Sequence, residues 1–193
     1  MAEFEYFIRK RGSKNSFEPI VLFGEASSLP HGISGSREIK NKGLLLIDYG
    51  AMYNGYCSDA TRTLYLGKPT KEYVKLYNIV LKAQEEAESI IRPGITAGEI
   101  DKVARDVITK EGFGNKFIHA TGHGVGLEIH EEPRLSKDNN AIIEKGMVIT
   151  VEPGIYLEGY GGIRIEDLVL VTDTSREILT KVGKDFEFKG GSL

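Results

Sequence analysis

The sequence has little that would support cross-linking, membrane insertion or secretion. Its single cysteine, Cys57, excludes a disulfide framework and a cysteine-rich zinc site. Apolar runs are short, as at Leu44 to Ile47, and fall far below the ~18 residues that a membrane span requires. The first residues lack the basic start, apolar stretch and cleavage site of a signal peptide. We therefore expect a cytoplasmic protein with no membrane partner.

An excess of positive charge is also missing. The 193 residues include 25 Lys and Arg against 28 Asp and Glu, a net charge of −3, and there is no long basic tract. This balance argues against nucleic acid as a partner. Hydrophobic residues make up 40% and charged residues 27%, which is typical of a folded globular protein, and the length predicts one domain. Glycine is in excess, at 23 of 193 positions, or about 12% against an average of about 7%.

Local patterns predict strands, then helices, then strands again. Thr70 can cap a helix that runs to about residue 92. Thr96 and Glu99 form a capping box for a second helix, which Gly112 closes. The other expected elements are a short helix over residues 1–11, strands at 20–23, 44–53, 56–66, 147–151 and 163–171, and short strand pieces within 122–130. This order predicts an α+β fold with the helices packed on one face of a sheet.

A predicted hairpin brings two aspartates together. Asn54-Gly55 between apolar, β-branched or aromatic segments is a strong hairpin signal. A two-residue turn there places Asp48 opposite Thr61 and diagonal to Asp59, about 7–8 Å away at the backbone. Two carboxylates on one face repel and must be desolvated, which is costly without a cation. The alternative is a pair of solvent-facing aspartates near a turn.

Three of the four histidines fall within twelve residues of a glycine-rich stretch. His123 lies in a Gly-His-Gly-Val-Gly segment, with His119 before it and His130 after it. The stretch lacks the lysine and spacing of a phosphate loop, and the glutamate that a zinc protease places after its first histidine. The alternative is a set of polar loop histidines that bond to the backbone.

Two glutamates interrupt otherwise apolar strands. Glu152 directly follows the strand predicted at 147–151, and Glu166 lies within 163–171. Ionised carboxylates are rarely buried unpaired, and the alternative is a surface pair of Arg164 with Glu166, worth under about 1 kcal/mol. Four carboxylates with one imidazole suit Mn(II), Co(II), Fe(II) or Zn(II), and they offer enough oxygens to bridge two ions.

In their sequence contexts these residues resemble the metal ligands of the pita-bread metallopeptidases, the family of methionine aminopeptidase, aminopeptidase P and prolidase. The matching positions, in chain order, are Asp48, Asp59, His123, Glu152 and Glu166. The resemblance covers about residues 4–180. It implies an α+β pita-bread fold, a curved antiparallel sheet with helices on its outer face. The contexts that look closest to prolidase and aminopeptidase P are Ser28-Leu29-Pro30-His31-Gly32, Asp48-Tyr49-Gly50-Ala51, Ser58-Asp59-Ala60-Thr61-Arg62-Thr63, His130-Glu131-Glu132-Pro133-Arg134 and Val151-Glu152-Pro153-Gly154-Ile155-Tyr156.

The resemblance implies a role for each metal ligand. Asp48 would chelate one of two divalent ions, which could be Mn, Co, Fe or Zn. Asp59 and Glu166 would bridge both ions, and His123 with Glu152 would complete the second. A water between the metals would be the nucleophile, and Glu152 would also act in catalysis by passing its proton to the leaving nitrogen.

The resemblance also implies residues that act on the substrate. His130 would be catalytic by hydrogen-bonding the developing oxyanion, and His31 is the third predicted catalytic residue. His119 and Arg164 would line the substrate site. Arg134, in a loop just past His130, would take the free carboxylate of a substrate with its planar guanidinium. A solvated loop arginine is the alternative for Arg134.

We therefore expect a dinuclear exopeptidase that hydrolyses Xaa-Pro bonds in short peptides with proline at the second position. The alternatives are a methionine aminopeptidase and a non-catalytic peptide-binding module on the same fold. We expect residues 1–188 to form a single catalytic domain without the N-terminal domain usual in Xaa-Pro peptidases, and residues 189–193 to form a flexible tail. A homodimer is compatible with the resemblance, and the native metal stays open.

Overall fold

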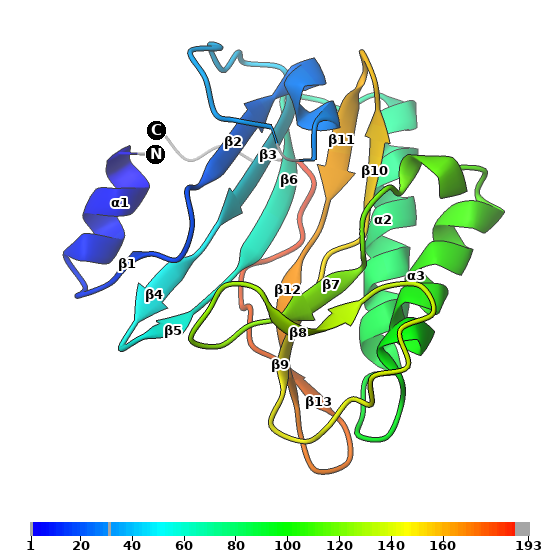
Figure 1. Cartoon of the computed structure of the whole chain (residues 1–193). Helices are drawn as coiled ribbons and strands as arrows, with labels where there is room; N and C mark the ends of the chain where they lie inside the picture. Colours follow the sequence, from blue (N-terminus) through cyan, green and yellow to red (C-terminus); the bar gives the residue numbers. More distant parts are fainter. Residues whose placement is uncertain (1, 31, 188–193) are drawn as a thin grey trace.

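The computed structural model describes residues 2–30 and 32–187. Its two longer helices lie on one side of a set of antiparallel strands, and the short first helix lies at the opposite side (Figure 1). The predicted His31 and the predicted tail at 189–193 lie outside the described residues. The helical elements are α1 (Ala2–Arg9), α2 (Lys71–Ser89), α3 (Ala97–Lys110) and the 3-10 turns η1 (Gly24–Ser28) and η2 (Gly114–Lys116). The strands are β1 (Lys14–Asn15), β2 (Ile20–Phe23), β3 (Gly43–Tyr49), β4 (Ala51–Tyr53), β5 (Tyr56–Cys57), β6 (Ala60–Leu66), β7 (Gly122–Gly124), β8 (Glu131–Leu135), β9 (Val148–Val151), β10 (Gly154–Leu157), β11 (Gly161–Arg164), β12 (Asp167–Val171) and β13 (Arg176–Ile178).

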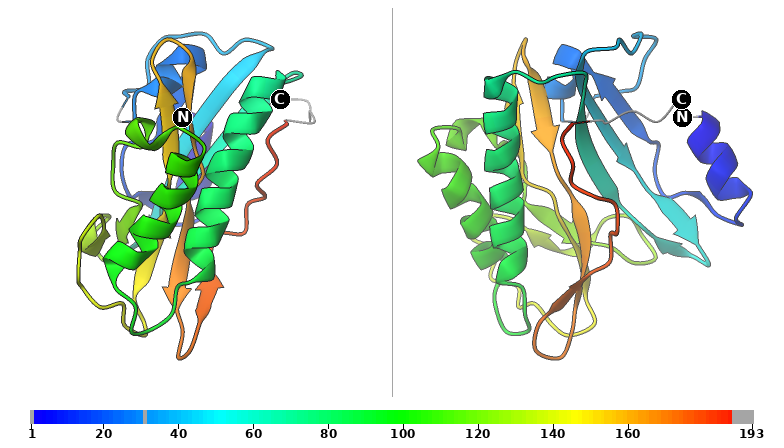
Figure 2. Two further views of the ribbon diagram at one scale, coloured as in Figure 1. Left: turned by 90° about the vertical axis from the view of Figure 1, so that its right-hand side faces the viewer. Right: turned by 180° about the vertical axis from the view of Figure 1, so that it is seen from behind.

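The strands pair antiparallel in four sheets. The orders are β1-β4-β5, β10-β11, β13-β12-β9-β7-β8 and β2-β3-β6. Helices α2 and α3 lie side by side and contact strands β8 to β11 (Figure 2). A core of apolar side chains fills the space between these helices and the strands. The α+β class expected from the sequence is confirmed.

Both predicted helix starts are confirmed. The Thr70 side chain accepts a hydrogen bond from the backbone N–H of Tyr73, and it caps α2. Thr96 and Glu99 form the complete capping box of α3. These caps are local, because donor and acceptor lie three residues apart. Within the described residues, none of the helices is long and apolar enough to cross a membrane.

The hairpin has the predicted register but contains an interruption. Asp48 pairs with Thr61 in the β3–β6 ladder, and Asn54 and Gly55 take positive φ values of 50° and 89° at the turn. The ladder breaks at Gly50, where a Cβ atom would lie 2.0 Å from the carbonyl oxygen of Ser58. Only glycine fits this approach, and the break sets Asp59 just before β6.

The strand predicted at 163–171 is divided, and this corrects the prediction of one continuous strand. Strand β11 pairs with β10, whereas β12 pairs with β9 and β13. Between them the backbone N–H of Glu166 donates to the carbonyl oxygen of Thr61 on β6, at 3.1 Å. The backbone therefore changes partners at Glu166, because it passes from one sheet to another.

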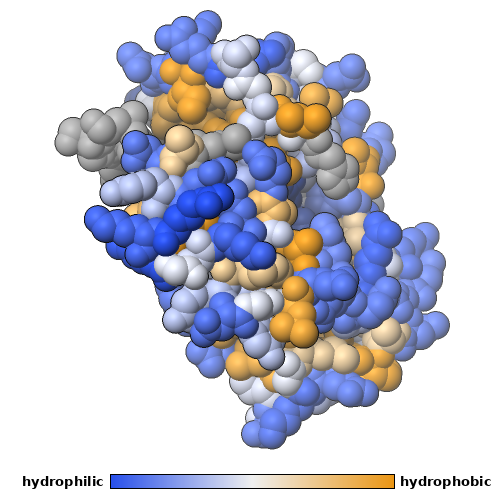
Figure 3. Space-filling view, turned by 60° about the vertical axis from the view of Figure 1, so that its left-hand side comes forward, coloured by the Kyte–Doolittle hydropathy of each residue, from blue (hydrophilic) through white to orange (hydrophobic). Residues whose placement is uncertain are grey.

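Figure 3 shows a face of the molecule that is covered mostly by hydrophilic side chains, with apolar side chains in several separate groups. Large apolar residues with exposed side chains include Tyr6, Phe7, Ile33, Tyr53 and Tyr56. Scattered exposed apolar residues are normal on a folded protein. The convergent polar groups lie instead in a cavity between the sheets.

Candidate metal centre

A cavity of about 530 Å³ collects the acidic and histidine residues that the sequence singled out. Residues from β3, β7 and β8 and from the ends of several strands line it. The lining includes Asp48, Asp59, His119, His123, His130, Arg134, Glu152, Arg164 and Glu166, together with Phe17, Ile20 and Pro30. Asp48 and Glu166, which lie 118 positions apart in the sequence, therefore share one site.

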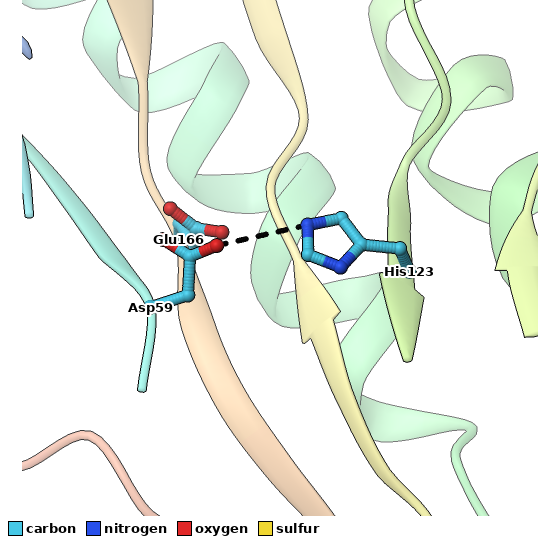
Figure 4. A group of neighbouring side chains, drawn as sticks. All are labelled: Asp59, His123 and Glu166. Atoms are coloured by element: carbon cyan, nitrogen blue, oxygen red, sulfur yellow. Dashed lines mark ion pairs between the residues drawn. The ribbon is translucent and has the colours of Figure 1, made fainter. Parts of the chain in front are cut away.

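Asp59, His123 and Glu166 form the tightest group in this cavity. One ligand atom from each lies within 4.8 Å of the other two, and Figure 4 shows the three side chains directed toward one another. Asp59 comes from the segment before β6, His123 from β7 and Glu166 from the junction of β11 and β12. Two carboxylates and an imidazole at this spacing can hold a divalent metal ion.

The His123 ring is oriented for metal binding. Its Nδ1 atom lies 2.8 Å from the carbonyl oxygen of Gly124 and therefore donates a proton to it. The other nitrogen, Nε2, lies 3.6 Å from Asp59 Oδ2 and 3.4 Å from Glu152 Oε1. Burial lowers the pKa of His123 to about 4. A neutral imidazole with Nε2 directed at carboxylates is the form that ligates metals.

Asp48 is buried and forms an ion pair with Arg164, so the alternative of solvent-facing aspartates is wrong. Arg164 Nη2 donates to Asp48 Oδ2 at 2.5 Å, and the two side chains are 4% and 13% exposed. The surface pair of Arg164 with Glu166 is also wrong, because both residues are buried. Asp48 Oδ1 has no hydrogen-bond partner among the described residues. An unpartnered buried oxygen of this kind is available to a cation.

Burial raises the pKa values of acids that line the cavity. Burial, followed by the charges of Asp48 and Glu152, raises the pKa of Asp59 to about 9. Burial also raises the pKa of Glu152 to about 7 and that of Glu166 well above its usual range. Arg164 lowers these pKa values but does not offset the burial. A divalent ion would supply the missing positive charge, so the residues present fit a metal.

The predicted substrate residues lie around this group. The His119 ring contacts the Ala120 carbonyl oxygen at 2.7 Å and the Tyr156 hydroxyl at 2.8 Å. The exposed His130 ring packs edge-on against His123, with centroids 4.5 Å apart. Arg134 is exposed, but it lies on β8 and not in the predicted loop. A strand places its side chain more rigidly than a loop would.

Arg164 uses all three guanidinium nitrogens inside the protein. Besides Asp48, it donates to the Thr61 hydroxyl at 3.0 Å and to the Tyr156 hydroxyl at 3.1 Å. It also donates to the carbonyl oxygen of Pro30 at 3.3 Å. Arg164 lines the cavity, but its hydrogen bonds hold Asp48 and Thr61 of the metal centre.

Two threonines that were given no role by the sequence also hold the centre together. Thr61 donates to Glu166 Oε2 at 2.6 Å. Thr150 donates to Glu152 Oε1 at 3.2 Å and accepts from the backbone N–H of His123 at 3.0 Å. Both threonines are fully buried in strands. A threonine at such a position indicates a hydrogen-bonding role, because a buried hydroxyl needs partners.

Comparison with known proteins places this geometry in a family. The Xaa-Pro dipeptidase of Pyrococcus furiosus is 46% identical over 185 residues, which cover 95% of this chain and 53% of that protein. The solved prolidase from Pyrococcus furiosus superposes with a TM-score of 0.92 at 46% identity, over 94% of this chain and 54% of that chain. X-Pro aminopeptidase from Thermotoga maritima MSB8 gives a TM-score of 0.93 at 42% identity, over 97% of this chain and 54% of that chain.

The chain spans about half the length of the curated relatives that it matches. The likeness to the solved prolidases and to aminopeptidase P of Escherichia coli confirms the predicted pita-bread fold. The model of metallopeptidase family M24 matches residues 1–173. With this match and these relatives, the chain belongs to metallopeptidase family M24.

Proposed function

We propose that this chain carries the catalytic centre of a dinuclear metallo-exopeptidase that hydrolyses Xaa-Pro peptide bonds. The observation that carries the proposal is the convergence of Asp59, His123 and Glu166 within 4.8 Å in one cavity. Asp48 and Glu152 line the same cavity. Relatives named Xaa-Pro dipeptidase and X-Pro aminopeptidase support the substrate class.

The five ligands would divide between two ions. Asp48 would hold one ion, His123 and Glu152 the other, and Asp59 and Glu166 both. Bound divalent ions supply Lewis-acid chemistry that lowers the pKa of water and polarises a carbonyl group. Mn, Co, Fe and Zn all accept such a ligand set.

The protein's own residues would handle protons and substrate. Glu152, whose Oε1 atom lies 3.4 Å from His123 Nε2 at the cavity, would accept a proton and pass it to the leaving nitrogen. His130, exposed at the cavity and in ring contact with His123, would donate a hydrogen bond to the developing oxyanion. His119 would position the peptide, and Arg134 would bind a free carboxylate.

We further propose that residues 1–188 form one catalytic domain, because α2, α3 and strands of three of the four sheets share one core. Substrates would be short peptides with proline at the second position. His31 belongs to the proposed catalytic set through its sequence context alone. Arg164 would line the substrate site, while its main contact holds Asp48.

A metal analysis and a peptide screen test the proposal. We expect about two equivalents of Mn(II) or Co(II) per chain, and hydrolysis of Ala-Pro or Ala-Pro-Ala that excess chelator abolishes. Cleavage of Met-Ala-Ser in preference to both would instead favour a methionine aminopeptidase. Binding of peptides without cleavage, in metal-loaded protein, would favour the non-catalytic module. Full activity without bound metal would overturn the proposal.

A further inference from the structure

We propose that residues 182–187, here called the C-terminal strap, position the metal centre. The strap would act through its own residue Lys184 and through Arg62 of β6. This inference rests on the proposed function. It gives a positioning role to residues that lie outside the cavity. The strap runs beside β6, where the backbone N–H of Tyr65 donates to the carbonyl oxygen of Phe186 at 2.7 Å. It therefore reaches the strand that follows Asp59.

Arg62 connects the strap to the metal centre. Its residue is 4% exposed, and its guanidinium has five N–H donors. Five acceptors of the described residues take them: the carbonyl oxygens of Thr61 at 2.9 Å, Glu166, Val182 at 2.8 Å and Gly183 at 3.1 Å, and Asp167 Oδ1 at 2.5 Å. Two of the five acceptors thus belong to the strap.

The same guanidinium joins the two halves of the centre. Thr61 lies on β6, in the sheet that carries Asp48, and Glu166 lies beside β12 of the five-stranded sheet. Arg62 Nη1 donates to the carbonyl oxygens of both residues. Because the regular ladder is interrupted at Glu166, this bridge helps set the separation between the two halves. Its geometry controls where the Glu166 carboxylate lies relative to Asp59.

Lys184 of the strap supplies the charge that this bridge needs. Its ammonium lies 2.7 Å from Asp167 Oδ2 and 3.4 Å from Glu88 Oε2, and it donates to Gln84 Oε1 at 2.7 Å. Asp167 is fully buried and accepts from Arg62 with its other oxygen. The charges of two acids, Asp167 and Glu88, are thus balanced behind the metal centre by those of Arg62 and Lys184. Without Lys184, Asp167 Oδ2 keeps only the hydrogen bond from the Gln84 amide at 3.1 Å among the described residues. The Asp167 charge then falls on Arg62 alone and draws its guanidinium away from the Glu166 carbonyl oxygen.

The strap has anchors that do not depend on the Lys184 side chain. The Tyr77 hydroxyl donates to the carbonyl oxygen of Lys184 at 2.7 Å. The Phe186 ring stacks on the Tyr77 ring, with centroids 4.3 Å apart. A change at the Lys184 side chain should therefore leave the strap seated. A substitution of Lys184 therefore tests the charge of its side chain and leaves the strap attached.

The test compares Lys184→Met with Lys181→Met. This control lies at an exposed lysine three residues away, whose ammonium donates to the carbonyl oxygen of Ile178. The probe is Co(II), titrated into metal-free protein and followed by its visible absorption, alongside thermal unfolding of the metal-free forms. We expect Lys184→Met to weaken Co(II) affinity by roughly 10- to 100-fold and to change the absorption spectrum. Lys181→Met should match the unsubstituted protein, and Lys184→Arg should recover part of the loss.

A purely structural role would lower the unfolding temperature and leave the Co(II) affinity of the folded protein unchanged. Folded Lys184→Met with unchanged affinity and spectrum would therefore overturn this inference alone. Should Lys184→Met fail to fold, Lys184→Gln removes the same charge and keeps a donor for Gln84, and unchanged affinity there would overturn the inference equally. If the unsubstituted protein binds no Co(II), both this inference and the proposed function fail.

Discussion

Replacement of Arg164 by methionine should destabilise the metal-free protein strongly. Arg164 is 3% exposed and bonds to Asp48, Thr61, Tyr156 and the Pro30 carbonyl oxygen. Methionine fills much of the same space but offers no charge and no donor. Asp48 would then keep a buried carboxylate with no cation, since its Oδ1 atom already lacks a hydrogen-bond partner among the described residues.

The magnitude follows from the burial of the pair. Removal of one partner of a buried ion pair costs about 3–5 kcal/mol, a large part of the roughly 5–15 kcal/mol that holds a domain folded. The cost should also depend on pH. Burial already raises the pKa of Asp48, and loss of Arg164 raises it further. An acid whose folded pKa exceeds its unfolded pKa destabilises the fold as the pH rises through that interval.

Urea denaturation of chelated protein at pH 5 and pH 8 measures this cost. We expect the larger loss at pH 8, and the double variant Arg164→Met/Asp48→Asn to be about 1–3 kcal/mol more stable than Arg164→Met, because it removes the unpaired charge. Arg37→Met is the control, since its pair with Glu25 is more than half exposed and should cost under about 1 kcal/mol. A loss equal to that of the control, or a double variant no better than the single one, would refute the reasoning.

Three further predictions concern the proposed function. Asp59→Asn and Glu166→Gln should each lose bound Mn(II) and hydrolysis of Ala-Pro together, measured by elemental analysis and a rate assay; retained metal would contradict their bridging roles. His130→Ala should keep its metal and lose roughly 10²–10³ in kcat, the size expected for one oxyanion donor, whereas loss of metal would assign it to the ligands. Arg134→Ala should raise KM for an Xaa-Pro dipeptide far more than for a longer peptide, and equal effects on both substrates would show that Arg134 does not bind the carboxylate.

The sequence by itself determined the local features. The pairing of Asp48 with Thr61 follows from a two-residue turn and the two-residue period of strands, and the structure has that register. The cap at Thr70 and the capping box at Thr96 likewise depend on contacts three residues apart. The sequence contexts of the acids and histidines pointed to the family that the comparisons establish.

Only the tertiary structure decided which long-range partners the polar residues take. Arg164 was expected to line the substrate site, with a surface pair with Glu166 as the alternative. It lines the cavity, but its guanidinium is buried against Asp48, 116 positions away, and not paired at the surface. The strand predicted at 163–171 changes sheets at Glu166 because Thr61 and Arg62 of another sheet bind its backbone. Strand periodicity tells which residues share a face, but the sheet that packs on that face comes from distant segments. The burial of these charges, and hence their pKa values and affinity for metal, arises only when those segments meet.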